Sequence, residues 1–173
     1  MTKYILCYSG GKDSTAMLIH CLKEHYPIDE ILYVDCGDWM WDCTSNHLQQ
    51  VEETLNVKIT SLSIQDKLDA GFKKWGFPSF VNRWCTGEKR EIMKQYIKEH
   101  YPNESIIQYI GYTVDETKRT AKKLYSSYDT KYPLVELNVT SRDAHNICKK
   151  YGFDFGGVYT HHSHFNCWCC PLQ

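Results

Sequence analysis

Six consecutive residues, Ser9–Ser14, bring together two glycines, two serines, a lysine and an aspartate directly after the apolar run Tyr4–Tyr8. Glycines allow a tight turn in which backbone N–H groups approach an anion closely. The amphipathic segment that follows indicates a helix, whose first turn supplies further N–H donors and the positive end of the helix dipole. Lys12 adds a full positive charge, and the serine hydroxyls add donors. The loop is therefore predicted to bind a phosphate or pyrophosphate group.

Two other glycine-rich phosphate loops do not match this stretch. A Walker A loop requires a longer arc before its Gly-Lys pair, and the dinucleotide fingerprint requires a third glycine. The six-residue signature Ser-Gly-Gly-Lys-Asp-Ser instead resembles that of the ATP-pyrophosphatase superfamily, which has an adenine nucleotide α-hydrolase-like fold. The alternative is a glycine-rich turn that binds nothing.

Two carboxylates lie at the end of the next predicted strand, Glu30–Asp35, and just beyond it. Asp35 and Asp38 flank Gly37. Carboxylates at such a place hold Mg²⁺ beside nucleotide phosphates or accept a hydrogen bond from a ribose hydroxyl. The alternative is a solvated loop. Cys36, which lies between them, is either a reactive thiol or a small packing residue.

Four cations are candidates for clamping an anion. Arginine suits bidentate contact with phosphate or sulfate, and lysine acts as a point charge. The alternative for each is a solvated side chain on a helix. The four residues are Arg83, Lys89, Arg90 and Arg119.

Cysteines near the end of the chain form a second chemical signal. Cys167 and Cys170 are a C-x-x-C pair, which lets two thiolates chelate one metal centre. Cys85 is predicted to lie in a loop that reaches them. We favour an iron–sulfur centre over a zinc ion, with free thiols and a redox dithiol as the remaining alternatives. The completing ligand would be Cys169, His161, His162 or His164.

The elements that must position these residues alternate between strands and helices. This alternation predicts an α/β fold: a doubly wound, mostly parallel five-stranded sheet with helices on both faces. Ligands of such sheets bind beyond the strand carboxyl ends, where Ser9–Ser14, Asp35–Gly37 and Gly111 would line one crevice. Strands are predicted at 4–8, 30–35, 57–62, 105–112 and, at an edge, 132–137; helices are predicted at 14–25, 44–56, about 68–75, 88–100, 115–123 and about 141–151.

Length and composition bound the class of protein. The 173 residues suit one domain with a core of its own, and 42% hydrophobic residues are ordinary for a globular protein. We predict a nucleotide-binding domain over 1–152 and a His- and Cys-rich tail over 153–173 that packs on it. A net charge of −1 makes no overall case for nucleic acid. Neither a signal peptide nor a membrane span is expected, so we predict a cytoplasmic protein whose nine cysteines form no disulfide framework.

Motifs along nearly the whole chain resemble those of the phosphoadenosine phosphosulfate (PAPS) reductase family, within the ATP-pyrophosphatase superfamily. Their order and spacing carry the resemblance. They are the loop 9–14, Val34-Asp35-Cys36-Gly37, the run 83–89 around Cys85, the run 111–119, Tyr132-Pro133-Leu134 with Asp143, and the run 167–171.

The resemblance implies roles for particular residues. Lys89 and Arg119 would join Lys12 and Asp13 as catalytic residues around the phosphates. Cys85, Cys167 and Cys170 would ligate a [4Fe-4S] cluster. The nucleotide would be ATP, adenylyl sulfate (APS) or PAPS, with Mg²⁺ as a further cofactor. The residues expected to contact it are Ser9, Gly10, Gly11, Lys12, Asp13, Ser14, Asp35, Gly37 and Gly111.

Three departures set this chain apart from cluster-bearing reductases. Trp84-Cys85 stands where they have adjacent cysteines, so Cys169 would have to replace one ligand. Tyr112-Thr113 stands where the family has an arginine, which weakens the predicted sulfate clamp. The C-terminal segment that carries the nucleophilic cysteine of true reductases is expected to be absent. We therefore expect a short, divergent member, of the type found on phages and mobile elements.

Three functions follow as hypotheses. The first is ATP-dependent activation of an acceptor, with pyrophosphate release, coupled to sulfur chemistry. The second is a true sulfonucleotide reductase, which would release sulfite. The third is a nucleotide-binding module without chemistry that serves a nucleic-acid or protein partner. A basic face around Lys118, Arg119, Lys122 and Lys123 would suit such a partner, although a solvated helix face is the favoured interpretation. The sequence does not indicate an oligomeric state.

Overall fold

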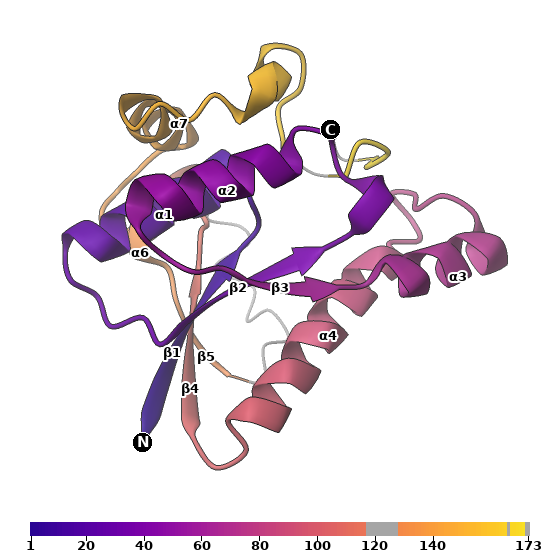
Figure 1. The fold of residues 1–173 in the computed structure, drawn as a ribbon, viewed down its shortest axis with the longest axis horizontal. Helices are drawn as coiled ribbons and strands as arrows, with labels where there is room; N and C mark the ends of the chain where they lie inside the picture. Colours follow the sequence, from indigo (N-terminus) through magenta and orange to yellow (C-terminus); the bar gives the residue numbers. More distant parts are fainter. Residues whose placement is uncertain (117–127, 166, 172–173) are drawn as a thin grey trace.

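The computed structural model describes residues 1–116, 128–165 and 167–171 (Figure 1). Within these residues five strands form one sheet in the order β3-β2-β1-β4-β5, and each neighbouring pair is parallel. The predicted α/β fold is confirmed. The strands are β1 (Thr2–Tyr8), β2 (Glu30–Asp35), β3 (Thr60–Ser63), β4 (Ser105–Ile110) and β5 (Asp129–Lys131).

Helices cover both faces of the sheet (Figure 1). One face packs against α1 (Lys12–Lys23), α2 (Thr44–Leu55), α6 (Pro133–Glu136) and α7 (Ser141–Lys150). The other face packs against α4 (Trp84–His100), which in turn contacts α3 (Gln65–Trp75). Short 3₁₀ segments also occur between these elements: η1 (Gly37–Trp39), η2 (Val114–Glu116) and η3 (Phe155–Thr160).

The central strand β1 is buried on both sides because successive side chains of a strand point to opposite faces. Leu6 and Tyr8 pack in the cluster that holds α1, whereas Ile5 packs in the cluster that holds α4. Each of the three is at most 3% exposed. The central strand therefore fixes the position of the loop that follows it.

The strand order reverses at β1. The chain continues from β1 to β2 and β3 on one side and then returns to place β4 on the other. The gap beyond the carboxyl ends of β1 and β4 is the topological switch point, where ligands of open α/β sheets bind.

The predicted fifth strand over 132–137 is wrong. β5 ends at Lys131, and Pro133 begins the short helix α6. Proline suits the first turn of a helix, because its missing N–H has no partner there in any case. The apolar residues Val135 and Leu137 favoured a strand in the sequence, but Pro133 starts a helix at this place.

Other boundaries shift by a few residues. α4 begins at Trp84 rather than near Glu88, so Cys85 lies in its first turn instead of in a loop. β3 is confined to Thr60–Ser63 within the longer predicted strand. Of the predicted helix over 115–123, the first two residues belong to η2 and the remainder lies outside the described residues.

The segment after residue 152 folds back onto the sheet. Phe153, Phe155 and Phe165 are at most 2% exposed and belong to the same core cluster as α1. His47 of α2 packs beneath them, with its ring centroid 4.4 Å from that of Phe155 and 5.5 Å from that of Phe165. The tail thereby lies at the end of the sheet where β1 leads into α1 (Figure 1).

Burial of His47 predicts a specific loss of stability in acid. Burial lowers the pKa of His47 to about 4, so between about pH 6.5 and pH 4 the unfolded chain binds a proton that the folded chain does not. The free energy of unfolding should therefore fall as the pH falls through this window, by up to about 3 kcal/mol from this residue. Urea unfolding at several pH values measures the effect.

The comparison variant is His47→Gln, which removes the titration and should flatten the curve below pH 6.5. His161→Gln, at an exposed position, should keep the wild-type pH dependence. A His47→Gln curve parallel to that of the wild type would contradict a neutral, buried His47.

Candidate functional site

The loop Ser9–Ser14 is a tight turn closed by its own side chains. Gly10 adopts φ +79°, a conformation that favours glycine. Ser14 Oγ accepts from Ser9 N at 3.1 Å, lies 2.9 Å from Ser9 Oγ and donates to Gly11 O at 3.0 Å. Gly11 is the N-cap of α1 and supplies no side-chain cap. The serines thus stabilise the turn, and the backbone N–H groups at the start of the helix depend on acceptors from elsewhere.

Lys12 and Asp13 form an ion pair at the start of α1. Lys12 Nζ lies 3.0 Å from Asp13 Oδ2, and Lys12 is only 9% exposed. Burial raises the pKa of Asp13, while the adjacent Lys12 ammonium opposes that shift. Among the described residues Asp13 Oδ1 is buried without a hydrogen-bond partner. The site therefore holds a carboxylate oxygen that still needs a donor or a cation.

Tyr159 of η3 contacts the same helix end. Its hydroxyl accepts a hydrogen bond from Lys12 N at 2.8 Å, and its ring centroid lies 5.4 Å from Lys12 Nζ. Tyr159 was not among the predicted site residues, because no motif in the sequence marks it. The only local signal is its place in the Gly- and His-rich segment 156–164.

Gly111 follows β4 and lies directly against the loop. A Cβ atom there would lie 3.0 Å from the Cα and N atoms of Ser14. This distance is tighter than ordinary van der Waals contact, and the atoms it meets are backbone atoms that cannot rotate away. The absence of a side chain at Gly111 lets the end of β4 close the switch point against α1.

Asp35 and Gly37 lie beside this loop at the end of β2. Asp35 Oδ1 accepts from Gly37 N at 2.8 Å, and Gly37 adopts φ +55°. Both residues line a pocket of about 480 Å³ together with Tyr33 and Ser61. The Tyr33 hydroxyl is buried without a hydrogen-bond partner among the described residues. Polar groups are therefore available to a ligand in this pocket.

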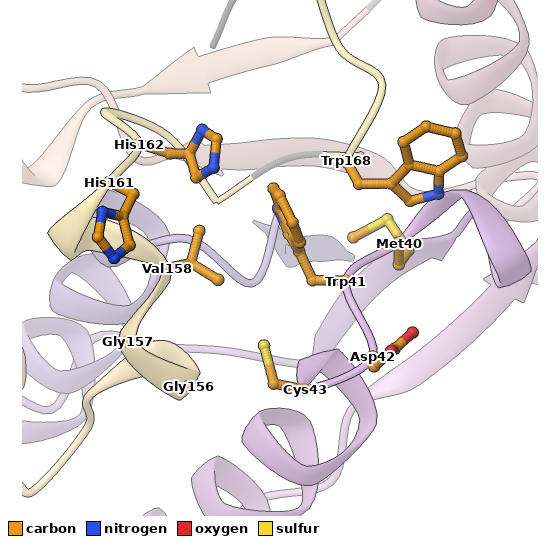
Figure 2. Close-up of a pocket in the computed structure, with 10 residues that line it drawn as sticks. All are labelled: Met40, Trp41, Asp42, Cys43, Gly156, Gly157, Val158, His161, His162 and Trp168. Carbon is orange, nitrogen blue, oxygen red and sulfur yellow. The ribbon is translucent and has the colours of Figure 1, made fainter.

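A second pocket, of about 580 Å³, adjoins the first through Met40, Trp41 and Asp42. Figure 2 shows the indole of Trp41 projecting into it between the tail and the loop after η1. His162 lies with its ring centroid 5.0 Å from that of Trp41. The other residues that line this second pocket are Cys43, Gly156, Gly157, Val158, His161 and Trp168.

The cysteine cluster comprises Cys36, Cys85, Cys167 and Cys169, which pack in one apolar group with residues of α3 and α4. Lys89 Nζ donates to Cys167 Sγ at 3.4 Å. The hydrogen bond from Cys36 lowers the pKa of the Cys167 thiol; burial opposes this shift and the Lys89 ammonium reinforces it. The same hydrogen bond, together with burial, raises the pKa of Cys36. Cys36, left open by sequence analysis, is therefore a central member of the group.

The cysteines fit a metal in chemistry but not in arrangement. Thiolates suit iron and zinc, and Cys85, Cys167 and Cys169 lie in one cluster. Cys170 is near enough to Cys85 to influence its pKa, which burial raises. Even so, the part of the chain that the structure describes contains no group of three or more His, Cys, Asp or Glu side chains able to hold a metal ion. The metal site stays a prediction, and the reaction proposed for the nucleotide site does not depend on it.

Some predicted site residues are not brought together with the loop. Arg83 and Arg90 are exposed near the start of α4. Asp38, by contrast, lines the same pocket as Asp35 and Gly37, where it accepts from Gln65 Nε2 at 2.9 Å. Arg119 and the rest of the basic face, Lys118, Lys122 and Lys123, lie outside the described residues. Within the described residues, no helix is long and apolar enough to cross a membrane.

Sequence comparison identifies one matching family. The family described as the phosphoadenosine phosphosulfate reductase domain matches residues 3–152. An uncharacterized protein of Methanocaldococcus jannaschii is 28% identical over 120 residues, which are 69% of this chain and 24% of that protein. The match thus spans about a quarter of the length of this curated relative.

Two solved structures share the fold at low identity. NH3-dependent NAD synthetase from Campylobacter jejuni, in complex with a nitrate ion, gives a TM-score of 0.60 at 16% identity, over 92% of this chain and 69% of that one. U34-tRNA thiolase NcsA from Methanococcus maripaludis, with its [4Fe-4S] cluster, gives a TM-score of 0.55 at 12% identity, over 98% of this chain and 60% of that one. At this identity the likeness shows the fold alone.

The close approach of Gly111 to α1 predicts a position-specific cost. Gly111→Ala should lower the free energy of unfolding by about 1–3 kcal/mol, because the added methyl group must displace the backbone at Ser14. Gly87→Ala is the matched control, since a Cβ at Gly87 meets nothing within 4 Å and alanine favours a helix over glycine by up to about 1 kcal/mol. Chemical denaturation of both variants measures the difference. Equal effects of the two substitutions would contradict the contact.

Proposed function

The chain belongs to the phosphoadenosine phosphosulfate reductase domain family, and from this premise we propose that it is an enzyme acting on the phosphate or sulfate end of an adenine nucleotide. The observation that carries the proposal is the start of α1 at the topological switch point. There the glycine loop, the Lys12 ammonium and Gly111 converge. Such a helix start favours an anion through its N–H groups and its dipole.

Phosphates are the anions that this site suits best. We place a phosphate oxygen on Lys12 N–H, where it replaces the Tyr159 hydroxyl. Lys12 Nζ neutralises the phosphate charge. Asp13 orients that ammonium through Oδ2, which leaves Oδ1 for Mg²⁺ or a water of its shell. Lys89 and Arg119 are proposed to join the clamp, although the latter lies outside the described residues.

The nucleoside is proposed to occupy the pocket lined by Tyr33, Asp35 and Gly37. Asp35 Oδ1 is engaged by Gly37 N, so the second oxygen of Asp35 would accept from a ribose hydroxyl. An acceptor would then enter the neighbouring aromatic pocket around Trp41, whose flat, apolar walls suit a planar ring. A nucleic acid or a protein could carry such an acceptor.

The proposed reaction is activation of that acceptor by ATP. An acceptor oxygen attacks the α-phosphorus, the bond from that phosphorus to the bridging oxygen breaks, and pyrophosphate leaves. Negative charge grows on the leaving group in the transition state. N–H groups at the start of α1 and the Lys12 ammonium lie where they would stabilise it. A sulfur nucleophile would then displace AMP from the acceptor.

A sulfonucleotide reductase is the second candidate, and the family match favours it. It would bind APS or PAPS on the same loop and release sulfite with a thiol donor. Pyrophosphate release from ATP and sulfite release from APS or PAPS separate the two candidates.

A [4Fe-4S] cluster or a zinc ion on Cys85, Cys167, Cys169 and Cys170 is a further proposal. The thiolase neighbour carries such a cluster, and three of these thiols share one apolar group. When bound, a cluster would supply an iron site for sulfur. Iron, sulfide and zinc analysis of anaerobically purified protein tests it.

All nine cysteines lie in described residues and none is in a disulfide. Free thiols suit a reducing compartment, and we propose that the protein is located in the cytoplasm.

Loss of Lys12 should weaken nucleotide binding. Lys12→Ala is expected to lower the affinity for ATP at least about tenfold, because a charge-assisted contact with phosphate is lost and tenfold corresponds to about 1.4 kcal/mol. Isothermal titration calorimetry with ATP, APS and PAPS gives the affinity for each nucleotide.

Lys23→Ala provides the control, because Lys23 is exposed in the last turn of the same helix. It should bind as the wild type does. Equal affinities for the two variants, or no binding of any of the three nucleotides by the wild type, would rule out the proposed site.

A further inference from the structure

Aromatic rings gather on the surface where α3 ends and the chain turns toward α4, at one end of the molecule (Figure 1). Single exposed apolar side chains are common on proteins, but a set of neighbouring ones marks an interaction site. These rings are between 40% and 73% exposed, and we call them the aromatic surface. Its members are Phe72, Trp75, Phe77, Phe80 and Trp168.

The core holds several of these rings in place from below. The ring centroid of Phe77 lies 4.7 Å from that of Phe72 and 6.3 Å from that of Trp168. Trp39, which is only 9% exposed, packs edge-on against both Phe72 and Phe77, at 5.8 and 5.9 Å. Its indole N–H donates to Asp69 Oδ1 at 3.0 Å, which fixes the ring. The exposed rings are therefore supported by packed side chains.

Positive charge accompanies the rings. Residues 70–83 include three cations, Lys73, Lys74 and Arg83, and no aspartate or glutamate, although the whole chain has a net charge of −1. All three cations are exposed, and within the described residues none of them forms an ion pair. Lys74 Nζ lies 4.5 Å from the ring centroid of Trp75. The aromatic surface thus suits a ligand that is both anionic and flat.

The aromatic surface continues into the pocket of about 580 Å³ around Trp41. Trp168 lines this pocket and also contacts Phe77 on the outside (Figure 2). Trp168 is held there by two hydrogen bonds to η1, from its backbone N to Trp39 O at 3.0 Å and from Nε1 to Asp38 O at 2.9 Å. A ligand on the surface can therefore extend toward the pocket proposed for the acceptor.

We propose that the aromatic surface binds a single-stranded nucleic acid, whose bases stack on the exposed rings and whose phosphates contact Lys73, Lys74 and Arg83. Every base has a face that stacks on an aromatic ring, and cations beside the rings follow the backbone. The strand has to be single because bases paired in a duplex do not expose their faces. Its role is to bring one base into the pocket around Trp41.

Charge and continuity favour a nucleic acid over a lipid bilayer. A bilayer would suit the tip of the loop, where Phe80 and Val81 are 73% and 99% exposed. It does not account for the contact from Phe77 to Trp168, which leads into a pocket. The proposal names the acceptor class of the proposed function and rests on that function for its role, but the binding itself is tested without ATP.

Fluorescence anisotropy of the full chain with labelled oligouridine and oligothymidine, each about 15 nucleotides long, measures the binding. Saturable binding of at least one strand is expected. The duplex of oligothymidine with oligodeoxyadenosine carries the same phosphates and should bind at least about fivefold more weakly. Binding of the single strands should also weaken with salt, and Lys73→Ala should reduce the slope of log K against log salt concentration by about 0.7.

Substitutions at Phe77 separate stacking from general apolar contact. Phe77→Leu should weaken binding at least about fivefold, because a stacked base is lost, whereas Phe77→Tyr keeps a flat ring and should bind within about twofold of the wild type. Tyr151→Leu and Lys150→Ala are the controls, since both residues are exposed on or just after α7, and neither should change binding. Unfolding midpoints establish that the variants fold.

Several results would overturn the proposal. They are no binding of either strand by the wild type, equal binding of the duplex, and equal affinities for Phe77→Leu and Phe77→Tyr. Binding to phosphatidylserine vesicles in place of the strands, or a dimer that Phe77→Leu dissociates, would assign the surface to a bilayer or to a second copy of the chain. ATP binding by calorimetry is scored separately, so loss of the strand surface and loss of the nucleotide site are distinguished.

Discussion

The backbone N–H of Lys12 needs an acceptor, because it lies in the first turn of α1 and that end of the helix is buried. Gly11, the N-cap residue, has no side chain to offer. The Tyr159 hydroxyl fills the place at 2.8 Å. This single hydrogen bond joins the glycine loop to a segment that no sequence motif marks, and the Tyr159 hydroxyl occupies the position that we propose for an anionic oxygen.

The other elements of the fold surround the start of α1. Parallel pairing of β1 with both β2 and β4 brings three loops to one edge of the sheet. The absence of a side chain at Gly111 lets the loop after β4 close against Ser14. The tail then covers the edge, held by the buried rings of Phe155 and Phe165 around His47. The proposed phosphate site and the cysteine cluster thus lie at the same edge of the sheet, although their residues are far apart in the sequence.

Features of the fold that depend on local residue patterns are predictable from the sequence. The sheet class and the turn at Gly10 follow from periodicity and from glycine chemistry. α7 begins at the predicted residue 141, where Thr140 and Asp143 form a capping box. Tertiary contacts decided the rest. Nothing in the sequence indicates that Cys36 meets Cys167 or that Tyr159 reaches Lys12, because both contacts depend on the path of the tail. A strand was likewise predicted where Pro133 begins a helix, since apolar residues suit both elements.

The most direct test of the phosphate site is the amide spectrum of ¹⁵N-labelled protein as ATP is added. We expect the largest shifts at the amides of Gly10, Gly11 and Lys12, because the Lys12 N–H would exchange the Tyr159 hydroxyl for a phosphate oxygen. Amides at the exposed end of α1 should not move. Binding of ATP that leaves these three amides unchanged, with shifts confined to the aromatic pocket around Trp41, would contradict it.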